Sequence, residues 1–171
     1  MSPAYRKQSV VKTPWFELVE KKYEGANAPY YVMEVPDYVS IIARNKMGRL
    51  VLVRQYRHAL DMTTTEFPSG HVDPGETPLQ SAQRELLEET AYHGGTWTAL
   101  TSLHSDVGRI CNLSHTYFAD QVEKHPTQPQ EAGIELLEIP AAELIAMAMR
   151  GQFSHSIHVA SLFLARENKL L

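Results

Sequence analysis

Alternating hydrophobic and polar residues dominate the first third of the 171-residue chain and predict strands. Turn residues separate four such runs, at residues 15–20, 30–35, 38–43 and 49–56. Residues 45–48 read Asn-Lys-Met-Gly, and Asn and Gly tolerate the positive φ angles of a tight hairpin turn. We therefore expect the first part of the chain to be mainly strand, with the last two strands joined as a hairpin.

A helix is expected to begin after Thr77, which is a favourable N-cap. Pro78 suits the first helical position, and Gln80 completes a Thr-x-x-Gln capping box. At 100° per residue one face collects the apolar side chains, and it can dock on a core. Its members are Leu79, Ala82 and Leu86.

The second half of the chain combines strands with two helices. Strands are expected at residues 97–103, 116–122 and 134–139, and residues 125–130 form a loop rich in Pro and Gln. Helices are expected at 141–150 and 156–168, with Gly151 between them. Mixed strands with one early and two late helices predict an α+β or layered α/β/α domain, not a regular βαβ series.

The composition is that of a soluble globular protein of one domain. A net charge of −4, with no basic run longer than Lys21-Lys22, argues against nucleic acid as a partner and favours a small nucleotide ligand. Cys111 is the single cysteine, and the N-terminus lacks the apolar core of a secretory signal, so we expect a cytoplasmic protein. No apolar run is long enough for a membrane span.

Three carboxylates crowd one side of the early helix. Glu85, Glu88 and Glu89 stand at i, i+3 and i+4, so they are neighbours on its surface. A solvated acidic face is the alternative reading, because like charges at this spacing cost only about 0.2–0.5 kcal/mol per pair. However, the turn-rich segment 66–75 before the helix can aim backbone carbonyls at the same point. Carboxylate and carbonyl oxygens suit a hard ion such as Mg²⁺, so the segment predicts a metal site.

The same residues resemble the Nudix box, Gly-x5-Glu-x7-Arg-Glu-U-x-Glu-Glu-x-Gly-U, where U is aliphatic. The matching positions are Gly70, Glu76, Arg84, Glu85, Leu86, Glu88 and Glu89. The resemblance implies a Nudix α/β/α sandwich with a mixed sheet over residues 38–171, preceded by a strand-rich extension over residues 1–37. It also implies hydrolysis of a nucleoside diphosphate linked to another group, with Mg²⁺ or Mn²⁺ as cofactor.

The resemblance further implies roles for individual residues. The metal ligands would be the carboxylates of Glu85, Glu88 and Glu89 and the carbonyl of Ser69. Arg84, with Glu76, would hold the helix geometry, and Arg84 and Glu88 are expected to serve catalysis. Ala91 and Tyr92 depart from the Gly-U end of the box. We expect the helix to continue through Ala91 and to stop at Gly94-Gly95.

Two flanking segments resemble the ADP-ribose pyrophosphatase branch of the family. They are Val-Arg-Gln-Tyr-Arg at residues 53–57 and Glu-Phe-Pro-Ser-Gly at residues 66–70. Arg54 and Arg57 face opposite ways on a strand, so at most one points into a given cleft. We expect Arg54 to bind a substrate phosphate or ribose, unless it is a surface arginine paired with a carboxylate. Glu66 is a further candidate for substrate binding.

Residues 130–135 resemble the acidic loop that supplies a general base in this branch. Glu131 is the first candidate and Glu135 the second, and the alternative is that both are solvated loop acids. Trp15 is a candidate for stacking on the nucleobase, although such aromatics more often belong to a core. His155 and His158 lack a carboxylate at ligand spacing in the sequence, so we do not expect them to form a zinc site.

The expected function is Mg²⁺-dependent hydrolysis of the pyrophosphate bond of ADP-ribose or a related nucleoside diphosphate sugar, giving a nucleoside monophosphate and a sugar phosphate. The branch carries a proline about fifteen residues past the box that this chain lacks, so other nucleoside diphosphate compounds and nucleoside polyphosphates remain alternatives. A non-catalytic nucleotide-sensing module is the alternative of another class. The resemblance also implies a homodimer formed through the first strands.

Overall fold

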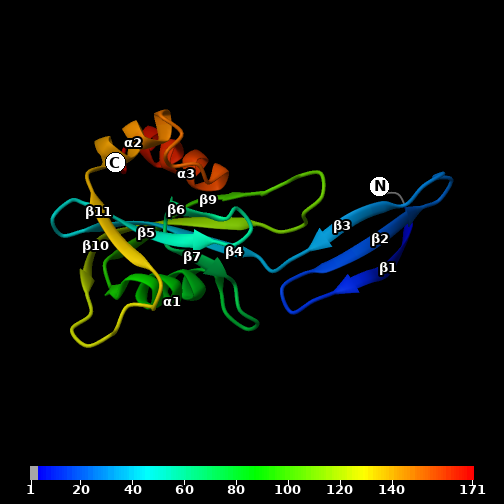
Figure 1. The fold of residues 1–171 in the computed structure, drawn as a ribbon, viewed down its shortest axis with the longest axis horizontal. Helices are drawn as coiled ribbons and strands as arrows, with labels where there is room; N and C mark the ends of the chain where they lie inside the picture. Colours follow the sequence, from blue (N-terminus) through cyan, green and yellow to red (C-terminus); the bar gives the residue numbers. More distant parts are fainter. Residues whose placement is uncertain (1–3) are drawn as a thin grey trace.

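The computed structural model describes residues 4–171 and shows a three-layered body with a separate sheet projecting from it (Figure 1). An eight-stranded mixed sheet forms the middle layer of the body. Helix α1 (Pro78–Thr90) lies on one face of this sheet, and helices α2 (Ala141–Met149) and α3 (Ser156–Glu167) lie on the other. The expected layered α/β/α fold is confirmed. The strands are β4 (Tyr38–Asn45), β5 (Leu50–Arg57), β6 (Met62–Glu66), β7 (Ser69–His71), β8 (Tyr92–His93), β9 (Thr96–Leu103), β10 (Ser114–Lys124) and β11 (Glu135–Ile139).

Strands β4 and β5 separate after a short paired stretch. They pair at Ala43↔Val51 and Arg44↔Leu50, and further along β6 pairs with β5 while β7 pairs with β4. The chain from 62 to 71 therefore fills the space between them. The sequence did not predict β6, because its Met-Thr-Thr-Thr-Glu run has no alternation of apolar residues.

Each face of the sheet carries its own hydrophobic cluster. The buried cluster under α2 and α3 includes Ile42, Leu52, Phe67, Leu144 and Leu162. The cluster under α1 includes Val39, Ile41, Val51, Ala82 and Leu86. Because β4 and β5 are covered on both faces, their inner residues form continuous apolar runs. Leu79 was expected on the docking face of α1, but it is 37% exposed and is not part of the cluster under the helix.

The start of α1 follows the sequence prediction and its end does not. The capping box between Thr77 and Gln80 is present, with Pro78 at the first position. The helix ends at Thr90, and Ala91 takes the left-handed conformation with φ 58°. The expected continuation to Gly94-Gly95 is wrong because the chain must reverse at once, so that β8 can pair with β10. An alanine in this conformation costs roughly 1–2 kcal/mol relative to the right-handed region.

The two late helices lie close to their expected positions. Gly151, with φ 72°, forms the turn after α2, and His155 is the N-cap of α3. In residues 4–171 no helix is both long and apolar enough to cross a membrane.

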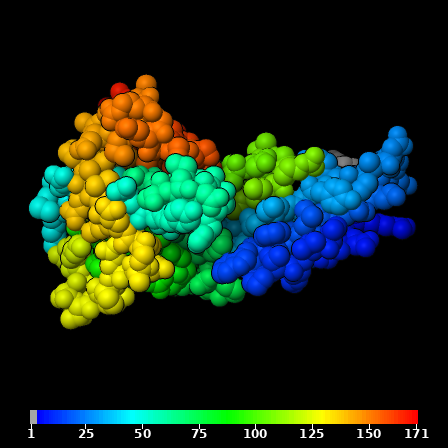
Figure 2. All heavy atoms as spheres, in the orientation of Figure 1, coloured from blue at the N-terminus to red at the C-terminus, as the bar shows by residue number. Residues whose placement is uncertain are grey.

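The N-terminal extension is a three-stranded antiparallel sheet of β1 (Tyr5–Lys12), β2 (Glu17–Tyr23) and β3 (Tyr30–Glu34). It projects from the body, and the loop of residues 104–113 reaches out to it (Figure 2). Met33 pairs with this loop, donating to the Arg109 carbonyl at 2.7 Å and accepting from the Cys111 amide at 3.2 Å. The Arg109 guanidinium lies over the Tyr30 ring at 4.0 Å. Strand β1 was not predicted, because it is exposed along its whole length and shows no apolar periodicity.

Candidate metal and active site

The three predicted carboxylates on α1 differ in burial. The residue Glu89 is 5% exposed, whereas the side chains of Glu85 and Glu88 are 15% and 49% exposed. The Glu89 carboxylate accepts a hydrogen bond from the Ser69 amide at 2.9 Å. This bond joins the helix to β7. It places the Glu89 carboxylate beside Ser69, whose carbonyl is the predicted fourth ligand.

Gly70 allows the second carboxylate to approach the sheet. A Cβ atom at position 70 would lie 2.1 Å from both Cδ and Oε1 of Glu85, far inside van der Waals contact. The backbone at Gly70 does not have a positive φ, so no turn conformation requires glycine there. Glycine is needed at this position because the Glu85 carboxylate occupies the space that a side chain would fill.

Arg84 lies among the acidic side chains and holds several of them together. Its guanidinium contacts Glu85 at 2.7 Å, Glu76 at 3.1 Å, Glu88 at 3.2 Å and Asp73 at 3.4 Å. It also donates to the His71 carbonyl at 3.2 Å. These contacts tie the loop before α1 to the acidic face of the helix.

We expect Arg84→Lys to lower the free energy of unfolding of the metal-free protein by about 1–2 kcal/mol, because an ammonium group cannot form several directed hydrogen bonds to separate carboxylates. A bound divalent cation supplies positive charge at the same face, so the loss should be smaller in Mg²⁺. Chemical denaturation with and without Mg²⁺ measures both values. Arg6→Lys, on the exposed strand β1, is the matched control. Equal losses with and without the metal would contradict the arrangement.

Burial disfavours the charged form of two of the carboxylates on α1. Burial raises the pKa of the Glu89 carboxyl to about 8, and the charges of Glu85 and Glu131 add to this effect. Burial also raises the pKa of Glu85, against the opposing effect of Arg84. Crowded carboxylates with oxygen-only donors match the requirements of a hard divalent cation such as Mg²⁺ or Mn²⁺. The residues therefore fit the metal that the sequence predicted.

The two candidate general bases have different surroundings. The Glu131 amide donates to the Glu88 carbonyl at 3.0 Å, which anchors the loop of residues 125–134 on the end of α1. The negative charge of Glu131 adds to the rise in the pKa of Glu89, of which burial is the main cause. Glu135 instead pairs across strands with Arg54, at 3.0 Å, and both side chains are largely exposed.

The other predicted substrate residue, Glu66, is buried beneath Arg57. The two side chains form a bidentate pair with distances of 2.8 and 2.6 Å, and Thr64 donates to the same carboxylate at 2.6 Å. Arg54 pairs instead with the exposed Glu135, so of the two arginines Arg57 is the one bound to a buried carboxylate. Burial raises the pKa of Glu89, and the positive charge of Arg57 opposes that rise.

A comparison with known proteins places this geometry in a family. A family model described as the NUDIX domain matches residues 35–157, which is well over half of the chain. The chain belongs to the Nudix family.

Individual relatives agree with this assignment. The chain is 26% identical over 119 residues to an ADP-ribose pyrophosphatase of Bacillus subtilis, covering 68% of this chain and 64% of that protein. It is 32% identical over 126 residues to an ADP-ribose pyrophosphatase of Mycobacterium tuberculosis, covering 71% of this chain and 61% of that protein. These matches thus span less than two thirds of the curated relatives. A crystal structure of an ADP compounds hydrolase superposes with a TM-score of 0.82 at 22% identity, over 98% of this chain and 94% of that chain, and shows the same fold.

Three residues in or beside this Nudix site were not assigned to it from the sequence. Asp73 joins the contacts of Arg84, and Arg57 holds the buried carboxylate of Glu66. Tyr38 donates to the Ser69 hydroxyl at 2.8 Å, and burial raises its pKa. The signal for Arg57 was present in the sequence, because Arg54 and Arg57 were known to face opposite ways. The side that each one faces depends on how β5 and β6 pair, which the sequence does not show.

The sequence near His155 and His158 has no carboxylate at ligand spacing, but the fold brings one to them from another segment. Glu66 lies with the two histidines, with ligand atoms within 4.8 Å of one another. However, Nδ1 of His158 accepts a hydrogen bond from the Phe67 amide, so the neutral ring carries its proton on Nε2. Neither nitrogen then offers a free lone pair to an ion.

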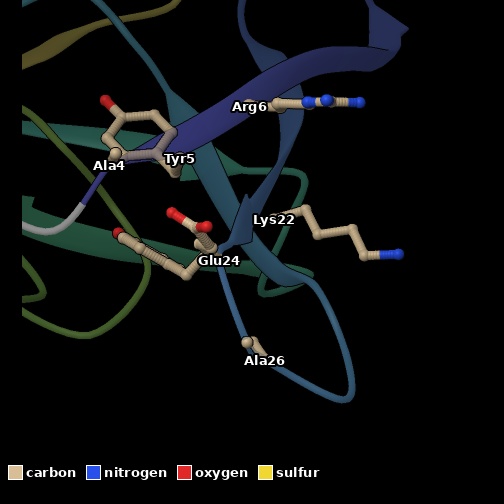
Figure 3. Close-up of a pocket in the computed structure, with 8 residues that line it drawn as sticks. Ala4, Tyr5, Arg6, Lys22, Glu24 and Ala26 are labelled. Atoms are coloured by element: carbon tan, nitrogen blue, oxygen red, sulfur yellow. The ribbon is translucent and has the colours of Figure 1, made fainter.

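Trp15 is 70% exposed and lies in the turn between β1 and β2. This turn is at the end of the extension nearer the body (Figure 1). A hollow of about 510 Å³ lies near the opposite end, lined by Tyr5, Arg6 and Lys22 among others (Figure 3). This hollow contains none of the predicted site residues.

Proposed function

We propose that this Nudix protein hydrolyses the pyrophosphate bond of ADP-ribose, with Mg²⁺ or Mn²⁺, to give AMP and ribose 5-phosphate. The observation that carries the proposal is the joining of α1 to β7, where buried Glu89 binds the Ser69 amide and Glu85 occupies the space above Gly70. The names of the two ADP-ribose pyrophosphatases among the relatives support the choice of substrate.

The residues of this chain have distinct parts in the proposed reaction. Glu85, Glu88, Glu89 and the Ser69 carbonyl would hold the divalent cation, which when bound neutralises diphosphate charge and lowers the pKa of an attacking water. Arg84 binds the carboxylates of Glu85 and Glu88 and keeps them oriented. In this proposal Arg57, held in place by Glu66, contributes positive charge toward the substrate side of the cluster.

Glu131 is the proposed general base. Its loop is attached to the last turn of α1 through the backbone, so the carboxylate can approach the reacting water while the loop stays anchored. Glu135 is the weaker candidate, because its carboxylate is paired with Arg54 across the strands and its position is on β11, not on the loop attached to α1. Arg54 and Trp15 remain predicted substrate contacts.

The test is a hydrolysis panel with Mg²⁺ that contains ADP-ribose, UDP- and GDP-sugars, NADH, diadenosine polyphosphates and dNTPs, with products identified by mass. We expect the highest kcat/KM for ADP-ribose, with AMP and ribose 5-phosphate as products. A preference for dNTPs or dinucleoside polyphosphates would replace the proposed substrate. Binding of nucleotides without turnover of any would support a sensing module instead.

The extension is the proposed contact in a homodimer. Apolar and aromatic side chains are exposed along it, namely Tyr5, Val10, Val11, Trp15, Tyr30 and Tyr31. Single exposed apolar residues are common, but a projecting sheet that carries several is typical of an interaction surface. An exposed edge such as β1 also offers unpaired backbone groups to a second copy.

We expect the protein to be a dimer by sedimentation equilibrium, and the double substitution Val10→Lys with Val11→Lys to make it a monomer, because two charges would be buried without partners in the interface. Met47→Lys is the control, since Met47 is 74% exposed in the turn between β4 and β5 and is not part of the extension. A monomeric wild type, or a dimer that tolerates both lysines, would contradict this surface.

A further inference from the structure

The segment between β6 and β7 contains backbone amides that have no partner in the sheet. It crosses from the edge of β5 to the edge of β4 where these two strands separate, so its amide groups do not all have a strand partner. Pro68 has no N–H, and its carbonyl accepts from the Ile41 amide at 2.9 Å. The amides of Phe67 and Ser69 lie on either side of the proline. Each needs a hydrogen-bond acceptor, because a buried N–H without a partner is costly.

Side chains from opposite helical layers satisfy these two amides. The Ser69 amide donates to Glu89 of α1 at 2.9 Å, and the Phe67 amide donates to Nδ1 of His158 of α3 at 3.2 Å. The two helices lie on different faces of the sheet (Figure 1). His158 is fully buried and packs beside the rings of Phe67 and Phe153, so its ring has little freedom to turn.

We propose that His158 is a positioning residue for the metal site, which holds the Phe67–Pro68–Ser69 segment from the α3 side as Glu89 holds it from the α1 side. The proposal rests on the metal assignment made above. Loss of the His158 acceptor would leave the Phe67 amide buried without a partner, and the segment would move to find one. Ser69 lies two residues further on, so its carbonyl would move with the segment.

Three substitutions separate positioning from simple stability. His158→Leu removes the acceptor while keeping an apolar side chain in the core. His158→Asn keeps an oxygen near the place of Nδ1, so it can still accept from Phe67. Leu162→Ala lies one turn further along α3, is buried in the same core and makes no side-chain hydrogen bond to the segment, so it destabilises the protein without touching the amide.

The measurement is Mn²⁺ affinity of the metal-free protein by electron paramagnetic resonance, well below the melting temperature of each variant. We expect His158→Leu to weaken Mn²⁺ binding at least about tenfold, as changes that misorient a ligand do. His158→Asn and Leu162→Ala should bind Mn²⁺ like the wild type. Unchanged binding in His158→Leu, or equal weakening in Leu162→Ala, would overturn the proposal.

If His158→Leu does not fold, the wild-type protein still decides the question. A scalar coupling across the hydrogen bond between the Phe67 amide nitrogen and His158 Nδ1 should be detectable by NMR, and its absence would overturn the proposal. Neither measurement depends on turnover. If ADP-ribose is not hydrolysed while Mn²⁺ binding follows the expected pattern, the proposed substrate fails and the positioning role stands.

Discussion

Glu89→Gln is expected to reduce ADP-ribose hydrolysis at least about a hundredfold, because it removes the charge of a metal ligand and with it several kcal/mol of transition-state stabilisation. The fold should survive, since the glutamine oxygen can still accept from the Ser69 amide. The measurement is kcat/KM at saturating Mg²⁺, together with the rise in melting temperature that Mg²⁺ produces. Both should be lost in the variant.

The protonation of Glu89 in the metal-free protein allows a lost metal ligand to be distinguished from a damaged fold. Burial raises its pKa to about 8, so near neutral pH the free carboxyl is mostly protonated and resembles an amide. The metal-free variant should therefore be at least as stable as the wild type, which separates a lost ligand from a damaged fold. Glu123→Gln, at an exposed position of β10, is the matched control and should leave the rate unchanged. Full activity of Glu89→Gln would remove this residue from the metal site.

Gly70→Ala is expected to raise the Mg²⁺ concentration for half-maximal activity at least about tenfold. The added methyl group would occupy the place of the Glu85 carboxylate, at 2.1 Å from its Cδ. The far end of a flexible side chain can move away, so we expect a folded protein with a displaced ligand. A Mg²⁺ titration of the hydrolysis rate measures the effect.

Two further variants make the Gly70 result specific. Gly108→Ala is the control, because its Cβ would meet only the end of Asp106, at 3.1 Å, on a surface loop. Adding Glu85→Asp to Gly70→Ala shortens the displaced side chain by one methylene, and it should recover part of the Mg²⁺ affinity. A wild-type Mg²⁺ response in Gly70→Ala would show that Glu85 does not bind the ion from this position.

The parts of the site that follow from local sequence could be predicted. Thr77 and Gln80 determine the start of α1 through contacts three residues apart. The spacing of Glu85, Glu88 and Glu89 then places the carboxylates on one side of the helix, whatever the rest of the chain does. Both inferences depend on interactions within one or two turns.

The remaining features depend on contacts between distant segments. Arg54 and Glu135 become partners only through the register of β5 against β11, which hydrophobic periodicity does not determine. His158 meets Phe67 across 91 residues of sequence. Ala91 ends α1 because β8 must turn toward β10 there, against the local preference of alanine for the helix.

The anchor at Glu131 determines which sequence changes the loop of residues 125–134 can tolerate. The loop is attached to α1 by a bond between two main-chain groups, the Glu131 amide and the Glu88 carbonyl, and any residue except proline can supply the amide. The composition of the loop is thus free to vary while its docking point stays fixed. Changes in its length are different, because an inserted or deleted residue on one side of position 131 shifts which side chain arrives at the anchor. Natural variation and directed evolution should therefore tolerate substitution in this loop far better than insertion or deletion.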